Sequence, residues 1–452
     1  MFDTIRPGSG AISGCKHVET SARPKRQFLS IIAFTATVCV AASTADAQQR
    51  DEEPTGEPVT LTELFEFAEE SAPDIQQARE RLGLGDAAIE GAERFQPFNP
   101  EIEGEFGVGL DDVGLSRAEI TLTQRLEIAG ERGLRIDAAR QQKEALQAEL
   151  ARARWDVHQQ VHRLYRQGLV DTDEVEIERD VLDFTQALFE VAEQRFEAGE
   201  EPRTSVIVAR AEVAQARQRL LQAQVRALRT RRDLGAVVGW TKQAAPQPTG
   251  EPEKAKPVPA KERLVEKAIA QDPQLAVLRA RLEQARADLA LEEREVWPAP
   301  LIGVGYEREN LASTDVENKL RLVVGVPLPL WDRNQGEIAA AKTRTDILRQ
   351  AIEDRKKVLG NLVVKQAASV QAAYGQTQIY QEEVLPALET QLDLLQEGFK
   401  LGELSLLDVM NARDRLLAVQ RQYLAALDEY YAAVSELEAL LGTAIWQANG
   451  DE

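Results

Sequence analysis

The sequence contains few of the residue types that most often carry chemistry. Its 452 residues include two cysteines, Cys15 and Cys39, two methionines and three histidines, and only 5% of the residues are aromatic. Both cysteines lie in the N-terminal segment that we expect to be removed, so the mature chain would contain no disulfide and no reactive thiol. The sequence contains no phosphate-binding glycine loop, no nucleophile–base set and no zinc-protease helix motif. These absences predict a protein that is not an enzyme and holds no cofactor.

The N-terminal segment has the pattern of a secretory signal peptide. Three basic residues at positions 23, 25 and 26 precede an apolar run over 28–42, and the small-x-small site Ala45-Asp46-Ala47 follows. This apolar run is too short to be a membrane-spanning helix. We expect cleavage after Ala47, and lipid attachment at Cys39 is the alternative that the sequence leaves open.

Acidic residues outnumber basic residues by 75 to 54, which gives the chain a net charge of −21. Such a balance disfavours binding to nucleic acid or to anionic membrane surfaces. It suits the passage of cations or contact with basic partner surfaces, although solubility alone also explains many acidic proteins.

A helix–turn–helix motif occurs twice in the sequence, with an offset of 203 residues. Each copy contains a glycine where a left-handed cap would end a helix, a conformation that glycine adopts without steric cost. A repeat at a fixed offset predicts a duplicated unit with two helical tips. The matching positions are Phe196 and Phe399, Gly199 and Gly402, Glu200 and Glu403, Val206 and Val409, Ala209 and Ala412, and Arg210 and Arg413.

Ahead of each long helical stretch, the spacing between apolar residues changes from about four residues, typical of a helix, to two, typical of a strand. Alternation over 101–110 and 118–123 predicts one β-hairpin, and alternation over 302–306 and 320–326 predicts a second. The strand lengths match those of transmembrane β-strands, although a half-buried hairpin in a soluble protein would look similar. The sequence therefore predicts a mainly α protein with four amphipathic strands per chain.

Long stretches without proline predict the helices that carry the tips. The first runs from Glu131 to Glu201 and would be about 100 Å long at about 1.5 Å per residue. The second runs from about Gln335 to Leu401, with a kink expected at Pro386. We divide the chain into a signal peptide (1–47), a first repeat (60–240, tip near 199), a proline-rich linker (241–260), a second repeat (261–442, tip near 402) and a C-terminal tail (443–452).

Four membrane strands cannot close a barrel on their own. Every backbone donor and acceptor must be paired inside lipid, so an open sheet edge is excluded there. If the strands span a membrane, several copies of the chain must pool them into one closed barrel. The polar alternate face would then line water, including Glu101, Glu103, Glu105 and Glu307.

The duplicated order of helix, β-hairpin, long helix, glycine tip and return helix resembles the TolC-type outer-membrane efflux factors over about residues 60–442. The segments 126–133 (LEIAGERG) and 326–336 (VPLPLWDRNQG) resemble the heavy-metal, cobalt–zinc–cadmium (CzcC-like) branch of that family. The resemblance implies a homotrimer with a shared twelve-stranded β-barrel in the outer membrane of a Gram-negative cell. A helical tunnel beneath the barrel would cross the periplasm and open when a periplasmic adaptor (membrane fusion protein) and an inner-membrane resistance-nodulation-division pump dock.

The resemblance also implies a gate just past the second tip, where acidic residues ring the pore. Asp408 matches the first acidic position, Asn411 stands at the second, and Leu404 stands where a basic residue is common. The side chains of Asp408, Leu404 and Leu407 would then form the constriction. Alternatively, Asp408 is a surface residue whose charge is favourable at a helix N-terminus. The implied adaptor contacts are Phe196, Gly199 and Glu200 at the first tip and Phe399, Gly402 and Glu403 at the second.

The histidines offer a weak candidate for a metal site. His158 and His162 are spaced i, i+4, which places both imidazoles on one helix face and can chelate a divalent ion. Val157 and Val161 mark the adjacent face as packed, so we expect a solvated face rather than a metal site. Met410 is the only methionine besides Met1, so this subunit lacks a methionine relay for Cu(I), which weakly favours Zn, Co, Ni or Cd as cargo.

The leading hypothesis is a passive exit channel of a tripartite heavy-metal exporter. The same architecture serving multidrug efflux or type I secretion is the second hypothesis. A soluble periplasmic coiled-coil scaffold or adaptor is the third, but it gives no reason for amphipathic strands at matching places in both repeats.

Overall fold

The computed structural model describes residues 56–108, 115–311, 315–384 and 406–446, together with Leu394, Gly398 and Leu404. The expected signal peptide and most of the tail lie outside these residues. All helices and strands below belong to one compact unit, Pro54–Glu452. No described helix is both long enough and apolar enough to cross a bilayer.

Helices and strands follow the predicted order, and their bounds agree with the sequence predictions to within a few residues over most of the chain. The first set comprises α1 (Leu61–Ser71), α2 (Pro73–Ala92), β2 (Glu101–Val108), β3 (Leu115–Arg125), α3 (Glu131–Glu197) and α4 (Arg203–Val238). The second comprises α5 (Lys261–Gln271), α6 (Pro273–Arg294), β5 (Leu301–Leu311), β6 (Asp315–Gly325), α7 (Gln335–Ile379) and α9 (Leu406–Leu441).

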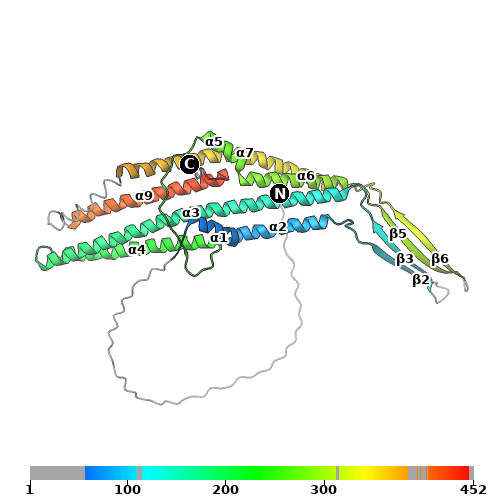
Figure 1. The fold of residues 1–452 in the computed structure, drawn as a ribbon, viewed down its shortest axis with the longest axis horizontal. Coiled ribbons are helices and arrows are strands. Elements are labelled where there is room, and N and C mark those ends of the chain that lie inside the picture. The colour runs from blue at the N-terminus through cyan, green and yellow to red at the C-terminus, as the bar shows by residue number, and fades with distance from the viewer. Residues whose placement is uncertain are drawn as a thin grey trace, which may run out of the picture. The chain divides into compact units, whose positions relative to one another are not determined.

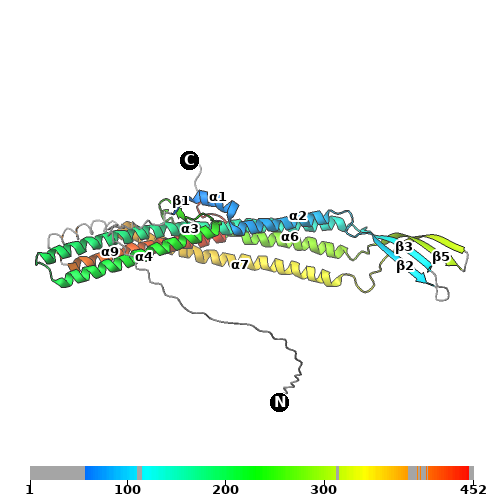
Figure 2. The same cartoon turned by 90° about the horizontal axis from the view of Figure 1, so that it is seen from below.

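The four long strands form one antiparallel sheet in the order β2-β3-β5-β6. The β3–β5 pairing joins the two sets of elements, with Ile120 opposite Tyr306. The sheet lies at one end of α2, α3, α6 and α7, and the turn between α3 and α4 lies at the other end (Figures 1 and 2). The long helices therefore separate the strands from the first tip.

Helix α3 is continuous over 67 residues, as its lack of proline predicts. It ends at Glu197, and the φ of 78° at Gly199, two residues further on, confirms the expected left-handed glycine. The amide of Glu200 donates to the carbonyl of Arg195 at 2.9 Å, which closes the helix end.

Helix α7 departs from the prediction because it does not continue as a regular α-helix toward Pro386. It ends at Ile379 and passes into a π-helical turn, Tyr380–Val384. Proline cannot donate to the carbonyl four residues earlier, which disturbs the turn before it. The turn is tied to α9, where Tyr380 Oη lies 3.3 Å from Gln422 Oε1 and Gln381 Nε2 donates to Tyr423 Oη at 2.9 Å. Pro386 itself lies outside the described residues.

The proline-rich segment 241–260, predicted to be a linker, is packed on the helices. Its strand β4 (Pro246–Pro248) pairs in parallel with β1 (Glu57–Val59). Aromatic side chains bind its backbone: Tyr430 Oη accepts from the amide of Lys256 at 2.8 Å, and Trp446 Nε1 donates to the carbonyl of Pro257 at 3.3 Å. The segment therefore packs on the helices as well as linking the two sets of elements. Composition does not reveal which side chains will satisfy an irregular backbone.

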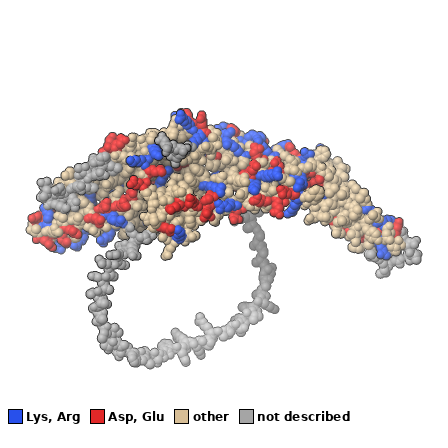
Figure 3. Space-filling model, in the orientation of Figure 1, with Lys and Arg blue, Asp and Glu red and all other residues tan. Residues whose placement is uncertain are grey.

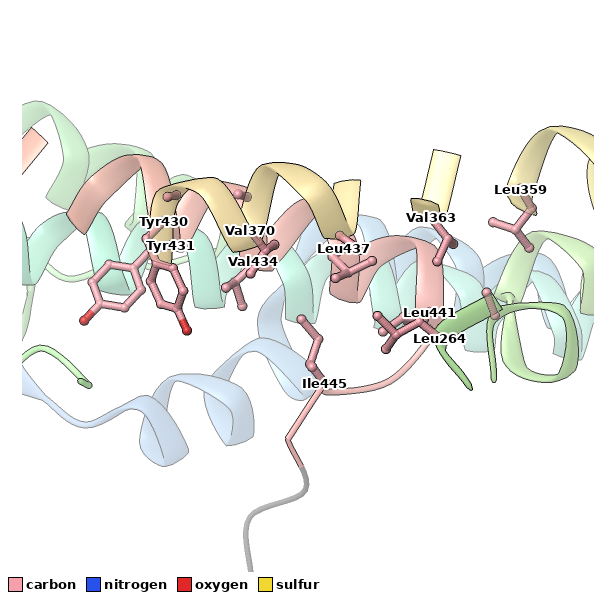
Figure 4. Close-up of a cluster of buried hydrophobic side chains, with 14 of the residues drawn as sticks. Leu264, Leu359, Val363, Val370, Tyr430, Tyr431, Val434, Leu437, Leu441 and Ile445 are labelled. Atoms are coloured by element: carbon pink, nitrogen blue, oxygen red, sulfur yellow. The ribbon is translucent and has the colours of Figure 1, made fainter. Parts of the chain in front are cut away.

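Two main hydrophobic clusters hold the helices together. One contains α1 and α2 packed on α3 and α4, through residues such as Leu64, Val161 and Leu234. The other joins α5, α6, α7 and α9, through residues such as Leu359 and Leu437 (Figure 4).

Glycine is required where each return helix ends. Gly239 and Gly442 have φ values of 74° and 70°, in the left-handed region. A Cβ on Gly239 would lie 2.1 Å from the carbonyl oxygen of Ser71, and one on Gly442 would lie 2.2 Å from that of Gln271. The same close approach therefore occurs in both sets of elements.

We predict that Gly239→Ala lowers the free energy of unfolding by about 2–4 kcal/mol, from left-handed strain and the clash with Ser71. Gly83→Ala is the matched control, because Gly83 lies within α2 and a Cβ added there would have nothing within 4 Å. The control should be neutral or stabilising by up to about 1 kcal/mol. Denaturant unfolding of the purified chain measures both, and equal effects of the two substitutions would contradict the prediction.

Candidate functional site

The tip region brings α9 against two consecutive helices, α3 and α4, that lie far from it in the sequence. Leu188 and Ala192 of α3, Ala209 of α4, and Val409 and Met410 of α9 form one buried apolar cluster, the tip cluster. This cluster fixes the start of α9 against the α3–α4 turn. The predicted gate residues at the start of α9 therefore lie close to the first tip, between α3 and α4.

The predicted gate residues divide into exposed and packed side chains. Asp408 lies in the first turn of α9 and is exposed, and Asn411 is exposed one turn later. Leu404 is partly buried against the tip cluster, so in this chain it contributes to packing. The side chain of Leu407 lies outside the described residues. The position of Asp408 suits both a pore carboxylate and a favourable charge at a helix N-terminus.

The first tip presents an exposed aromatic ring and several carboxylates. Phe196 is exposed, and Arg195 forms ion pairs of 3.7 Å with both Glu200 and Glu201. These pairs brace the turn around Gly199. At the second tip, Phe399, Gly402 and Glu403 lie outside the described residues.

Sequence reasoning missed a row of buried charged contacts between α3, α4 and α9, which we call the ionic seam. Arg413 is 1% exposed and donates to Thr185 Oγ1 at 2.6 Å and to Glu212 Oε2 at 3.4 Å. Further along, Arg421 donates to the buried Glu178 at 2.8 Å through Nε. The remaining described members are Arg219, 3.6 Å from Glu178, and the pair Arg166–Glu438, also at 3.6 Å.

A signal for the ionic seam was present in α3. Glu178 and Thr185 are seven residues apart and lie between Val175, Val181 and Leu188, in the stripe that packs. Polar residues at heptad spacing inside an apolar stripe indicate buried partners on a facing helix. Their partners could not be identified from sequence, because α9 is more than 200 residues away.

His158 and His162 lie on α3 and face α1. The ring of Phe65 stacks on His158 with a centroid distance of 4.0 Å, and the two imidazoles are 4.8 Å apart. Burial, with smaller effects from Arg166 and His158, lowers the pKa of His162 to about 3, and burial also lowers the pKa of His158. The expected solvated face is therefore wrong. The described residues also contain no group of three or more His, Cys, Asp or Glu side chains able to hold a metal.

These histidines predict acid-sensitive stability. The unfolded chain protonates them below about pH 6.5, whereas the folded chain resists until near the lowered pKa values, so stability falls as pH decreases from about 6.5 toward 3. The loss is at most about 1.4 kcal/mol per pH unit for each histidine. His162→Gln should reduce the difference in urea midpoint between pH 7 and pH 5. An unchanged difference in the His158→Gln/His162→Gln double variant would contradict this assignment.

The sheet has one exposed apolar face and one charged face. The apolar face carries large side chains that no described residue covers, and Leu322 is 78% exposed. On the other face Glu307 is only 3% exposed, and Arg117 Nε lies 3.0 Å from its carboxylate. Glu119 pairs with both Arg117, at 2.8 Å, and Arg321, at 3.3 Å, and Arg321 also pairs with Glu307. This network crosses the β3–β5 pairing and links the two hairpins.

A duplicated helical unit with such a sheet can be compared with known proteins. The family model described as outer membrane efflux protein matches residues 64–240 and 264–443. The chain belongs to the outer membrane efflux protein family. The sequence prediction of an efflux channel that is not an enzyme is thereby confirmed.

The chain is also similar to individual proteins of known sequence or structure. The chain is 28% identical over 393 residues to the cobalt-zinc-cadmium resistance protein CzcC of Cupriavidus metallidurans, covering 85% of this chain and 90% of that protein. The crystal structure of CusC matches with a TM-score of 0.67 at 17% identity, covering 85% of this chain and 92% of that one. VceC of Vibrio cholerae matches with a TM-score of 0.64 at 18% identity, covering 85% and 97%. The two structures establish the fold alone.

Proposed function

We propose that three copies of this chain form one outer-membrane channel, with the twelve strands closed into a barrel and the long helices forming a tunnel across the periplasm. The observation that carries the proposal is the four-stranded sheet, which has an exposed apolar face and a charged face. In this four-stranded sheet, β2 and β6 are the edge strands. Because sheet edges must be paired inside lipid, β6 of one copy would pair with β2 of the next.

The proposed cargo is a heavy-metal cation of the Co, Zn, Cd or Ni type, conducted passively. Similarity to CzcC over most of the chain and the excess of acidic residues support this choice. A periplasmic adaptor would dock at the tips, with Phe196, Gly199 and Glu200 as contacts on the first tip. An inner-membrane pump of the resistance-nodulation-division type would drive transport. Export would require removal of the N-terminal signal peptide after Ala47.

Deleting the gene and measuring growth tests the cargo. We expect increased sensitivity to Zn, Co and Cd with unchanged sensitivity to drugs, and complementation by the intact gene should restore tolerance. Drug sensitivity with normal metal tolerance would instead assign the channel to multidrug efflux. A secretion defect with normal tolerance to both would assign it to type I secretion.

The proposed gate predicts a change in conductance. Three copies of Asp408 around a narrow pore would concentrate negative charge and bind cations there. Asp408→Ala should therefore raise conductance or reduce block by divalent cations in planar bilayers. Glu436→Ala, which removes an exposed carboxylate far along the same helix, is the control and should have no effect. Identical conductance and block in both variants would count against a gate at Asp408.

A further inference from the structure

The two edge strands of the sheet, β2 and β6, differ in the charges that they carry on its charged face. Glu101, Glu103 and Glu105 lie on this face of β2, and none of them is in an ion pair within the described part of the chain. The same face of β6 presents Arg321, whose side chain is 42% exposed. Two β2 edges would bring glutamates opposite glutamates, which is destabilising. The charges therefore favour a head-to-tail contact between β6 of one copy and β2 of the next.

The two hairpins are equivalent, so each strand of one has a counterpart in the other. Strands β2 and β5 each start directly after a proline, at positions 100 and 300, which matches the exposed ring of Phe106 with that of Tyr306. Within the hairpins, Phe106 pairs with Ala118 and Tyr306 pairs with Leu320. Ala118 of β3 therefore corresponds to Leu320 of β6, and later residues of the two strands correspond at the same offset.

The pairing of the two hairpins within one chain, the internal joint, shows how two copies can be aligned. In the internal joint, Ile120 of β3 lies opposite Tyr306 of β5. Their counterparts are Leu322 and Phe106, so the same pairing between copies places Leu322 opposite Phe106 of the next copy. All four side chains are exposed on the apolar face, and Figure 3 shows few charged side chains on the part of the sheet next to the helices. A shift by one residue would mix the apolar and charged faces.

An ion pair crosses the internal joint on the charged face. Arg117 of β3 lies directly opposite Glu309, yet its Nε atom is 3.0 Å from the carboxylate of Glu307, two residues away along β5. Such diagonal neighbours are within reach of long side chains. Glu307 is only 3% exposed, so the diagonal contact buries a carboxylate in the joint.

A joint between copies repeats this diagonal arrangement. At the alignment given above, Arg321 lies opposite Gly107 of the next copy, and Glu105 of that copy is its diagonal neighbour in the same direction. Gly107 has no side chain, which leaves space for the guanidinium to cross. Within its own copy, Arg321 pairs with Glu119 at 3.3 Å through Nη1 and with Glu307 through Nη2. A guanidinium has five N–H donors, so donors remain for Glu105.

The alignment also gives a barrel of ordinary geometry. A row of paired residues crosses the sheet from Glu103 through Thr121 and Gly305 to Arg321, and the alignment continues it at Gly107 of the next copy. Each copy thus advances the row by four residues along the strand. Around three copies, with about 3.3 Å per residue and about 4.8 Å between strands, this advance tilts the strands by about 35°, as in closed barrels. An advance of only two residues per copy would tilt them by about 20°, which is too little.

We propose that Arg321 of each copy donates to Glu105 of the next copy and that this contact sets the alignment of β6 on β2 when the barrel closes. The contact reproduces between copies the ion pair that Arg117 and Glu307 form within one copy. It makes the β2 edge specific for β6, because Glu105 meets a cation from another copy only there. This inference rests on the proposed trimeric channel and adds the residues that join its copies.

Disulfide cross-linking tests the alignment in the full-length protein in its outer membrane. With the two native cysteines replaced by serine, the variant Leu322→Cys/Phe106→Cys carries one cysteine on each edge strand. Oxidation should convert it mainly into covalently linked trimers on a non-reducing gel. The controls Leu322→Cys/Gly104→Cys and Val324→Cys/Phe106→Cys move one partner by two residues in opposite directions, to Cα separations of about 7–8 Å that a disulfide does not span. Both controls should stay mainly as single chains.

A double-mutant cycle tests the ion pair. Glu105→Gln should lower the temperature at which the trimer dissociates in SDS. It should have no further effect in the Arg321→Gln background, where the partner is already lost. Glu101→Gln is the matched control, because it removes a glutamate from the same face of β2 that is not a neighbour of Arg321 at this alignment. Its effect should be the same in both backgrounds.

Cross-linking of either control pair in place of Leu322 with Phe106 would overturn the proposed alignment. Equal effects of Glu105→Gln in both backgrounds would overturn the ion pair. An outer-membrane trimer in which none of the three pairs cross-links would overturn this inference and leave the proposed channel standing. A soluble monomer would overturn both.

Discussion

Replacing Leu322 with arginine should prevent the chain from assembling in the outer membrane. Leu322 lies on the exposed apolar face of β6, and an arginine near the middle of a bilayer costs about 2–4 kcal/mol. In a trimeric barrel this cost would be incurred once per copy. We expect the fraction of the protein recovered as an outer-membrane oligomer to fall to near zero.

Val323→Arg is the matched control for this experiment. Val323 is the next residue of β6, so its side chain points to the charged face, opposite Gly303. An arginine there would meet water and carboxylates rather than lipid. Recovery close to that of the unsubstituted chain is expected. Equal loss from both substitutions would mean that the sheet does not present one face to lipid.

Replacing Arg413 with methionine should destabilise the tip region strongly. Arg413 is 1% exposed, and its loss would leave Thr185 and the partly buried Glu212 without their charged partner. Removing one member of a buried ionic contact costs about 3–5 kcal/mol. The midpoint of denaturant unfolding measured by helical circular dichroism should therefore shift to clearly lower denaturant concentration.

The duplication supplies the control for Arg413. Arg210 is its counterpart in the first repeat, but it is exposed and lies over the ring of Phe189 at 5.5 Å. Arg210→Met should cost no more than about 1 kcal/mol, the value of an exposed cation–π contact. Adding Glu212→Gln to Arg413→Met should recover part of the loss. Equal destabilisation by Arg210→Met and Arg413→Met would contradict a special role for the ionic seam.

The elements that local sequence controls were predictable. Helix α3 follows from a long run without proline that ends at Gly199, and the strands follow from a change of apolar period. Both signals act within a few residues of the chain. This explains why the four strands and the long helices could be predicted without any structure, whereas the β3–β5 pairing of the two hairpins could not.

Features that depend on distant partners were not predictable. Arg210 and Arg413 stand at equivalent repeat positions, yet one is exposed and the other is buried, because α4 and α9 have different neighbours. His158 and His162 were placed on a solvated face because their partner, Phe65, lies on another helix. The packing of segment 241–260 likewise depends on Tyr430 and Trp446, which lie 174 and 189 residues from the backbone groups they bind.

The gate stays a prediction. The family resemblance placed Asp408 and Asn411 there, and both are exposed at the start of α9. Leu404 was expected at the constriction, but its side chain is partly buried against the tip cluster. An apolar residue near a turn can pack inward or line a pore, and local sequence does not distinguish between these positions.

Membrane fractionation followed by mass measurement of the detergent-extracted protein tests the central claim most directly. The proposed channel predicts that the protein is recovered in the outer-membrane fraction and that its mass in detergent, corrected for bound detergent, equals three chains. A monomer recovered in the soluble periplasmic fraction would contradict it and would favour a periplasmic scaffold.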